Sequence, residues 1–208
     1  LVICGYLKNA AQSQLLAFVS TLVVLSAFVV ITTELLNVFN LVATLPVFIS
    51  WLLFFISGVF IWFRNGKYMP VFSFPTGFTA FEKKMLVGIA FILVITGVTA
   101  VVAYPNNWDS MTYHLGRVMQ WIQHGNVNHY PTRIDRQLTQ PPLAEYEILH
   151  LLLLSNNDRL ANLIQWVFFG GCISVIVLLA TAIGFNKTTT ITAAFLTATI
   201  PMAILQST

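Results

Sequence analysis

The residues best suited to chemistry lie in one short polar stretch, residues 106–121, which reads NNWDSMTYHLGRVMQW. It holds a carboxylate at Asp109, an imidazole at His114 and a guanidinium at Arg117. A carboxylate or an imidazole can transfer a proton, and a guanidinium can bind a phosphate group through two parallel hydrogen bonds. The stretch therefore combines the groups needed for proton transfer beside a phosphate-containing ligand.

Asp109 directly follows a long apolar run at residues 85–104. A carboxylate at the boundary between membrane and water sits half in a low-dielectric medium, which makes it a better general base. Asp109 is also suited to be an N-cap that accepts amide hydrogen bonds from the first turn of a helix. The two roles are compatible.

The residues after Asp109 have the spacing of an amphipathic helix that ends at Gly125. One face carries Met111, Leu115, Val118 and Ile122, and the opposite face carries Tyr113, Arg117, Gln120 and His124. We expect this helix to lie on the membrane with its apolar face down. Trp108 and Trp121 would anchor it at the level of the lipid headgroups.

The remaining candidates for binding are the other arginines and the histidines of residues 105–159. Arg133 and Arg136 join Arg117 as candidates for holding a phosphate, and the alternative for all three is contact with lipid headgroups. Asp135, between Arg133 and Arg136, is most simply an ion-pair partner. No HxxxH or HxxH pair occurs, which favours surface or core histidines over zinc ligands. The four histidines are His114, His124, His129 and His150.

The composition predicts an integral membrane protein. Hydrophobic residues make up 57% of the 208 residues and charged residues only 8%, with a mean hydropathy of +0.81. Soluble domains have roughly a quarter of their residues charged. The few basic residues are scattered, which argues against nucleic-acid binding. Cys4 and Cys172, which lie in apolar runs, are expected to be packing residues.

Five segments are long and apolar enough to cross a bilayer core of ~30 Å as helices. They are residues 15–35, 41–63, 85–104, 160–183 and 188–206, and residues 1–7 resemble the end of an earlier span. Residues 141–154 are too short and contain two glutamates and a histidine, which are costly in mid-membrane. We expect that segment to run along the interface without crossing.

Basic residues predict which loops face the cytoplasm. Residues 64–84 contain Arg64, Lys67, Lys83 and Lys84, so we place this loop inside and residues 105–159 outside. With residues 141–154 not crossing, Lys8 and Lys187 also fall inside and Glu34 outside. The outer segment holds nine of the seventeen charged residues, which predicts a functional loop there.

Further motifs follow Asp109 in a recognisable order: YP at 130–131, QPPLAEY at 140–146 and NDRLANLIQW at 157–166. In this order they resemble the start of polytopic GT-C glycosyltransferases of family 39. That group includes protein O-mannosyltransferases, aminoarabinose transferases acting on lipid A and bacterial relatives resembling dolichyl-phosphate-mannose mannosyltransferases. The resemblance covers residues 85–208, and residues 1–84 are additional N-terminal spans with a cytoplasmic loop.

The resemblance implies an all-α, polytopic transmembrane fold with an extracytoplasmic loop of juxtamembrane helices. It implies transfer of a sugar from a polyprenyl-phosphate-linked donor to a lipid, glycan or protein acceptor outside the bacterial plasma membrane. Asp109 matches the family's acidic residue, which serves as the base or acts through a divalent metal ion. Residues placed at the substrate are Tyr113, His114, Arg117, Arg133 and Arg136.

Two positions depart from the family pattern. Ser110 stands where many members have a second acidic residue, which counts against a metal site, and Gln140 replaces a frequent basic residue. The family also has another acidic motif in the next outer loop. We therefore expect the enzyme to continue beyond Thr208 and the fragment alone to be inactive.

Other functions remain open from the sequence. A transporter or channel would place ionisable groups near the membrane midplane, whereas here the polar cluster lies outside the spans. A second alternative is a noncatalytic membrane scaffold whose outer loop binds a partner. Loss of activity in an Asp109 variant would identify an enzyme, whereas a scaffold has no such activity to lose. A lipid-flipping role in the same pathway is a third alternative.

Overall fold

The computed structural model describes residues 10–64 and 76–208, with side chains from residue 14 onward. Every regular element in this part of the chain is a helix, which confirms the predicted all-α class. The expectations for Cys4, Lys8, Lys67 and residues 1–7 concern positions outside the described residues.

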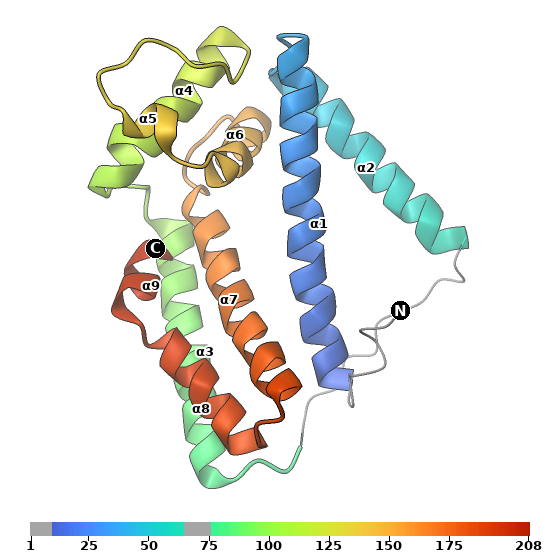
Figure 1. Cartoon of the computed structure of the whole chain (residues 1–208), viewed down its shortest axis with the longest axis vertical. Coiled ribbons are helices and arrows are strands. Elements are labelled where there is room, and N and C mark those ends of the chain that lie inside the picture. The colour runs from blue at the N-terminus through green and yellow to red at the C-terminus, as the bar shows by residue number, and fades with distance from the viewer. Residues whose placement is uncertain (1–9, 65–75) are drawn as a thin grey trace. The chain divides into compact units, whose positions relative to one another are not determined.

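Four of the described helices are long and apolar enough to cross a membrane (Figure 1). They are α1 (Ala10–Val38), α2 (Thr44–Arg64), α3 (Ala80–Val102) and α7 (Asn162–Ile183). Each corresponds to one of the predicted spans. The chain is therefore a polytopic helical membrane protein.

The fifth predicted span, residues 188–206, is not a single helix. It consists of α8 (Lys187–Ala198) and α9 (Pro201–Gln206), with Ile200 in an extended conformation between them. Pro201 has no N–H to donate and disfavours a helical conformation in the residue before it. At about 1.5 Å per residue, α8 is ~18 Å long, which is too short to cross the bilayer core.

The chain divides into two compact units, and each is described by itself. The first comprises Leu1–Val24, Pro70–Val102 and Gln165–Thr208, and the second comprises Leu25–Met69 and Ala103–Ile164. The second unit contains the polar residues that the sequence singled out.

In the first unit, the N-terminal ends of α3 and α8 lie together. Glu82 closes a capping box at the start of α3 and accepts a 2.8 Å hydrogen bond from Thr188. The ammonium of Lys187 donates to the carbonyls of Thr76 and Gly77 at 3.1 and 2.9 Å. Lys187 thus lies beside the residues that directly precede α3.

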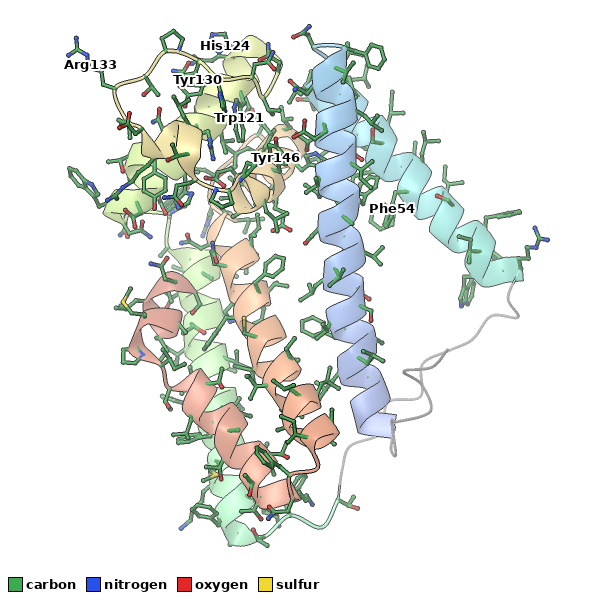
Figure 2. The ribbon with its side chains drawn as sticks, viewed as in Figure 1. Phe54, Trp121, His124, Tyr130, Arg133 and Tyr146 are labelled. Carbon is green, nitrogen blue, oxygen red and sulfur yellow. The ribbon has the colours of Figure 1, made fainter. Side chains whose placement is uncertain are left out.

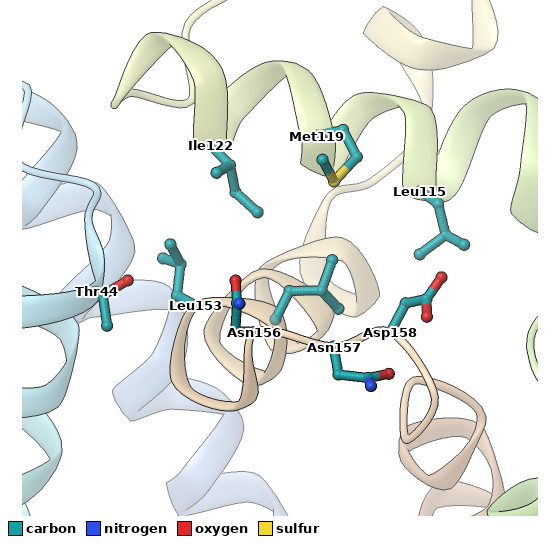
Figure 3. A pocket seen from close by; sticks show the side chains of 9 residues that line it. Thr44, Leu115, Met119, Ile122, Leu153, Asn156, Asn157 and Asp158 are labelled. Carbon is teal, nitrogen blue, oxygen red and sulfur yellow. The ribbon is translucent and has the colours of Figure 1, made fainter.

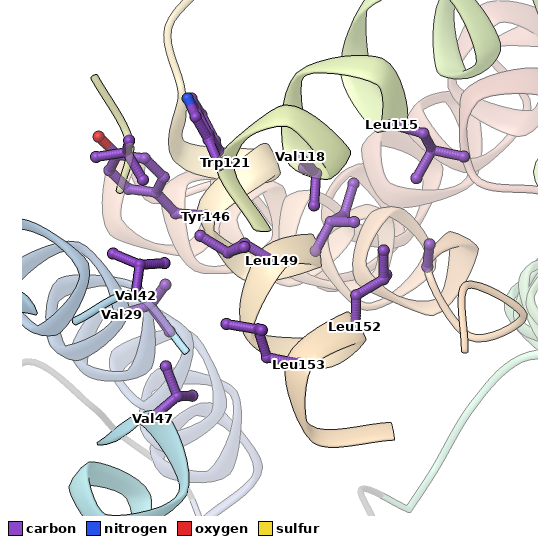
Figure 4. Close-up of a cluster of buried hydrophobic side chains, with 13 residues drawn as sticks. Val29, Val42, Val47, Leu115, Val118, Trp121, Tyr146, Leu149, Leu152 and Leu153 are labelled. Carbon is purple, nitrogen blue, oxygen red and sulfur yellow. The ribbon is translucent and has the colours of Figure 1, made fainter. Parts of the chain in front are cut away.

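The second unit is built around α6 (Leu143–Ser155), which is covered by α4 (Leu115–His124), the C-terminal part of α1 and α2 (Figure 4). The side chains of Leu149 and Glu145 are fully buried. The core comprises Val29, Val42, Val47, Leu115, Val118, Trp121, Val127, Tyr146, Ile148, Leu149, Leu152, Leu153 and Ala161.

This packing corrects two expectations about the loop. Leu115 and Val118 of α4 face α6, so the apolar side of this helix packs against protein and is not free to rest on lipid. Trp121 is also buried, with 4% of its surface exposed, whereas Trp108 is exposed. Only Trp108 remains available as a headgroup anchor.

The two ends of the segment between α3 and α7 lie next to each other. The side-chain amide of Asn162 donates to the carbonyl of Ala103 at 3.3 Å and so joins its two ends. Helix α6 has 13 residues and is ~20 Å long. It is not among the candidate spans, in agreement with the expectation that residues 141–154 do not cross.

Polar side chains fasten α6 to α1 inside the second unit. The three pairs are Ser26–Glu147, Thr33–His150 and Glu34–Tyr146. Burial raises the pKa of the Glu147 carboxyl and of the Tyr146 hydroxyl. These bonds compensate polar groups that would otherwise be costly to bury.

His150 connects three helices as a neutral imidazole. Trp51 of α2 donates to its Nδ1 at 3.1 Å, so the hydrogen of the neutral ring is on Nε2. That Nε2 lies 2.9 Å from the hydroxyl oxygen of Thr33, which itself donates to the carbonyl of Val29. Every group in this network has a partner, and burial lowers the pKa of His150 to about 4.

Protonation of His150 should make stability depend on pH. The unfolded chain takes up a proton near pH 6.5, whereas the folded chain does so only near pH 4. The contribution of His150 to stability is therefore complete above pH 6.5. It falls by up to about 1.4 kcal/mol for each unit by which the pH drops from 6.5 towards 4. Unfolding in detergent, followed across this range, measures the slope.

The matched variants are His150→Gln and His129→Gln, because His129 is exposed. His150→Gln should flatten the slope and His129→Gln should leave it unchanged. An equal slope in His150→Gln and the wild type would show that the network does not hold a neutral imidazole.

Candidate functional site

The helix that carries the candidate residues begins seven residues before α4, at residue 108. Its N-cap is Asn107, whose side-chain oxygen accepts a 2.7 Å hydrogen bond from the amide of Ser110. Asp109 already has helical backbone angles and makes no capping bond, so its predicted N-cap role is wrong. Gly125 ends the helix with a φ of 66°, as predicted.

A π-helical turn, Ser110–His114, precedes α4. The amide of Leu115 bonds to the carbonyl of Ser110, five residues back, so residues five apart lie nearly above one another. Asp109 and His114 therefore share a face that a regular α-helix would not give them. Such turns inside α-helices occur frequently at functional sites.

Asp109 keeps an accessible carboxylate. Its side chain is 43% exposed, and its Oδ1 lies 3.6 Å from a guanidinium nitrogen of Arg136. Burial raises the pKa of the Tyr113 hydroxyl, and the charge of Asp109 and a hydrogen bond to its carboxylate raise that pKa further. Arg136 also lies over the Tyr113 ring at 5.7 Å. Asp109, Tyr113 and Arg136 thus form one contiguous group.

A second group centres on Glu145, at the start of α6. Its Oε1 lies 2.9 Å from Nδ1 of His114 and 3.3 Å from Nη1 of Arg117. The same Arg117 nitrogen donates to the carbonyl of Gln140 at 3.0 Å, and the guanidinium lies 5.1 Å from the centre of the Trp121 ring. Arg117 is 3% exposed and is directed at α6 rather than at solvent.

The two groups touch through their rings, because Tyr113 and His114 lie with their centres 4.2 Å apart. Four of the six predicted site residues therefore lie together with Glu145: Asp109, Tyr113, His114 and Arg117. Arg136 joins them from α5 (Arg136–Thr139) through Asp109. Arg133 is exposed and lies on the outer turn of the loop (Figure 2).

Gln137 attaches the arginine-bearing loop to the π-helical turn. Its side-chain oxygen accepts hydrogen bonds from Tyr130 and Thr132, at 3.0 and 2.9 Å. Its nitrogen donates to the carbonyl of Thr112 at 2.8 Å. This buried amide fixes the start of α5, and with it the position of Arg136 relative to Asp109.

Glu145 and Gln137 are the residues that sequence reasoning missed. A signal for Glu145 existed in its position: an acidic residue between apolar residues needs a partner when buried. The partner could not be named, because Arg117 and His114 are 28 and 31 positions away. Nothing in the sequence distinguished Gln137 from other loop amides.

A divalent metal does not fit the described residues. No group of three His, Cys, Asp or Glu side chains among them is placed to hold an ion. Asp109 has Arg136 beside it instead of another carboxylate.

A separate pocket of about 350 Å³ lies between α4 and the C-terminal end of α6 (Figure 3). Its apolar wall is formed by Leu115, Met119, Ile122, Leu152 and Leu153. Its polar part is formed by Thr44, Asn156, Asn157 and Asp158. Leu115 is the only lining residue adjacent in sequence to the candidate site.

Comparisons with known proteins add no relative: no family model, curated protein or solved structure matches this chain.

The buried pair of Arg117 and Glu145 should carry a large share of the stability of the second unit. Arg117→Met leaves the Glu145 carboxylate buried without its guanidinium and should cost about 3–5 kcal/mol. Adding Glu145→Gln removes the uncompensated charge and should restore part of that loss. Unfolding of the single and double variants in detergent measures both effects.

Arg133→Met is the control, because Arg133 is exposed, and it should change stability by less than about 0.5 kcal/mol. If Arg117→Met were as stable as this control, the ion pair would not support the fold.

Proposed function

We propose that this protein is an integral membrane glycosyltransferase that moves a sugar from a polyprenyl-phosphate-linked donor to an extracytoplasmic acceptor. The observation that carries the proposal is the accessible carboxylate of Asp109, with a cationic guanidinium and a phenol beside it. The order of motifs from Asp109 to residues 157–166 supports it as well. The acceptor is a lipid, a glycan or a protein.

In the proposed reaction, Asp109 accepts the proton of an acceptor hydroxyl as that oxygen bonds to the anomeric carbon. The bond from this carbon to the phosphate oxygen breaks, and the lipid phosphate leaves with the electron pair. A positioned base contributes roughly 10²–10⁴ in rate. Arg136 is placed to stabilise the phosphate, since it lies beside Asp109 and is itself 62% exposed. Arg133, on the same loop, is a second cation available to the donor.

The position of the site suits such a donor. Helix α3 ends at Val102, shortly before Asp109 in the chain. A polyprenyl tail stays in the membrane while its phosphate and sugar meet water, so the reacting groups must lie at the membrane boundary. A carboxylate that closely follows a span meets this requirement.

The distribution of charge in the four candidate spans favours an enzyme over a transporter. Charged residues lie only at their ends: Glu34 near the end of α1, Arg64 at the end of α2, and Glu82, Lys83 and Lys84 at the start of α3. A transport path generally needs polar or ionisable groups near the midplane. In these helices the ionisable groups are instead near the boundaries.

Replacing the base should abolish transfer without unfolding the protein. In the full-length protein, Asp109→Asn keeps the size and the hydrogen-bonding oxygen of the side chain but cannot accept the proton. We expect transfer from a polyprenyl-phosphate sugar donor to fall by about 10²-fold or more. Membrane preparations and the radiolabelled donor measure the rate.

Asp135→Asn is the matched control, since Asp135 is an exposed carboxylate of the same loop and makes no ion pair among the described residues. It should transfer at the wild-type rate. Wild-type transfer by Asp109→Asn would exclude Asp109 as the base, and the absence of any transfer in the wild type would favour a scaffold.

A further inference from the structure

One ring nitrogen of His114 is bonded to the protein, and the other has no hydrogen-bond partner among the described residues. Nδ1 lies 2.9 Å from the Glu145 carboxylate, whose side chain is 1% exposed, whereas the His114 side chain is 29% exposed. A carboxylate only accepts hydrogen bonds, so Nδ1 carries the hydrogen. Nε2 makes no hydrogen bond to any described residue and is therefore the nitrogen available to a ligand.

Glu145 holds this ring firmly because its own position is fixed. It lies at the start of α6, fully buried, and the guanidinium of Arg117 balances its charge at 3.3 Å. Its second oxygen, Oε2, has no hydrogen-bond partner among the described residues. A carboxylate that orients an imidazole through Nδ1 also stabilises the imidazolium form once the ring takes up a proton.

The charged groups around His114 favour protonation of its ring when an anion binds. The ionised groups around it form two pairs: Glu145 of α6, which contacts the ring, with Arg117 of α4, and Asp109 at the helix start with Arg136 of α5. Two are carboxylates and two are guanidiniums, so they balance one another. Tyr113, whose ring lies beside that of His114, has a raised pKa and stays neutral. A bound phosphodiester would add a single negative charge, which a proton on His114 would neutralise.

We propose that His114 takes up a proton when the phosphate group of the substrate binds, and that its Nε2–H then donates a hydrogen bond to that phosphate. Glu145 is the positioning residue that fixes the ring and stabilises its charge. This inference rests on the proposed function. It adds His114 to the residues that bind the phosphate, a role that the sequence had suggested for arginines.

In the proposed reaction, Asp109 acts on the acceptor hydroxyl and His114 acts on the leaving phosphate. Asp109 receives the proton of the acceptor hydroxyl. As the bond between the anomeric carbon and the phosphate oxygen breaks, the imidazolium of His114 stabilises the charge that develops on that oxygen. The imidazolium keeps its proton during this step, and it returns the proton to solvent after the lipid phosphate departs.

Binding of a phosphodiester should therefore depend on pH in a defined direction. Because binding is coupled to proton uptake by the ring, affinity is highest at low pH, where the ring is protonated before the ligand binds. Affinity falls as the pH rises and levels off at high pH, where the ring stays neutral in the complex as well. A suitable probe is geranylgeranyl methyl phosphodiester, because a phosphodiester keeps one negative charge over this range. Between about pH 5.5 and about pH 8 its Kd should increase about tenfold.

The measurement uses the full-length protein in phosphatidylcholine nanodiscs, with binding followed by calorimetry at both pH values. His114→Gln should bind with a Kd that does not change with pH and stays near the wild-type value at pH 8. His114→Lys should bind tightly at both pH values, since a lysine remains charged. Glu145→Gln should lose most of the tight binding at the lower pH.

The control is His124→Gln, because His124 is exposed on the same helix and its Nδ1 lies 2.7 Å from the carbonyl of Gln120. It should keep the tenfold pH dependence. A pH-independent Kd in the wild type, or unchanged pH dependence in His114→Gln, overturns the role of His114. If Asp109→Asn still abolishes transfer in either case, the proposed function survives. No binding of the probe at any pH overturns both.

Discussion

The second unit depends on one buried carboxylate. Glu145 is fully enclosed at the start of α6, and an ion in such a place costs several kcal/mol unless it is paired and hydrogen-bonded. Its partners, Arg117 and His114, come from the helix that begins at residue 108. Because only that helix supplies them, it must cross α6 at one register, and its apolar face then packs on Leu149 and its neighbours. A single electrostatic requirement thereby positions both helices.

The same requirement arranges the candidate site. With Arg117 and His114 directed at Glu145, the π-helical turn brings Asp109 onto the face that His114 occupies. Asp109 stays accessible because its own counterion, Arg136, comes from an exposed helix and approaches only to 3.6 Å. One carboxylate is thus buried and structural, and the other is open. A difference in environment of this kind lets two chemically similar groups have different roles.

Helix α6 shows how polar residues can be misread in an apolar segment. Glu145, Glu147 and His150 argued against a membrane span, and α6, with 13 residues, is not among the helices long and apolar enough to cross. The same residues were taken to favour a helix at the interface, whereas each has a partner inside the protein. The cost of an unpaired polar group was estimated correctly from the sequence. The sequence could not show that α1, α2 and α4 supply the partners of these polar groups.

The sequence by itself determined the elements that local physics controls. Apolar length defined the four candidate spans, Gly125 ended the site helix, and residues 141–154 are too short and too polar to be a further candidate. Two local features were also present but misjudged: Asn107 rather than Asp109 caps the helix, and Pro201 divides the last predicted span. Only the tertiary structure decided that Glu145 joins His114 and Arg117, and that Gln137 holds Arg136 beside Asp109. Those pairings link residues far apart in sequence, and they form because burying a charge or an amide is favourable only where the fold supplies its partner.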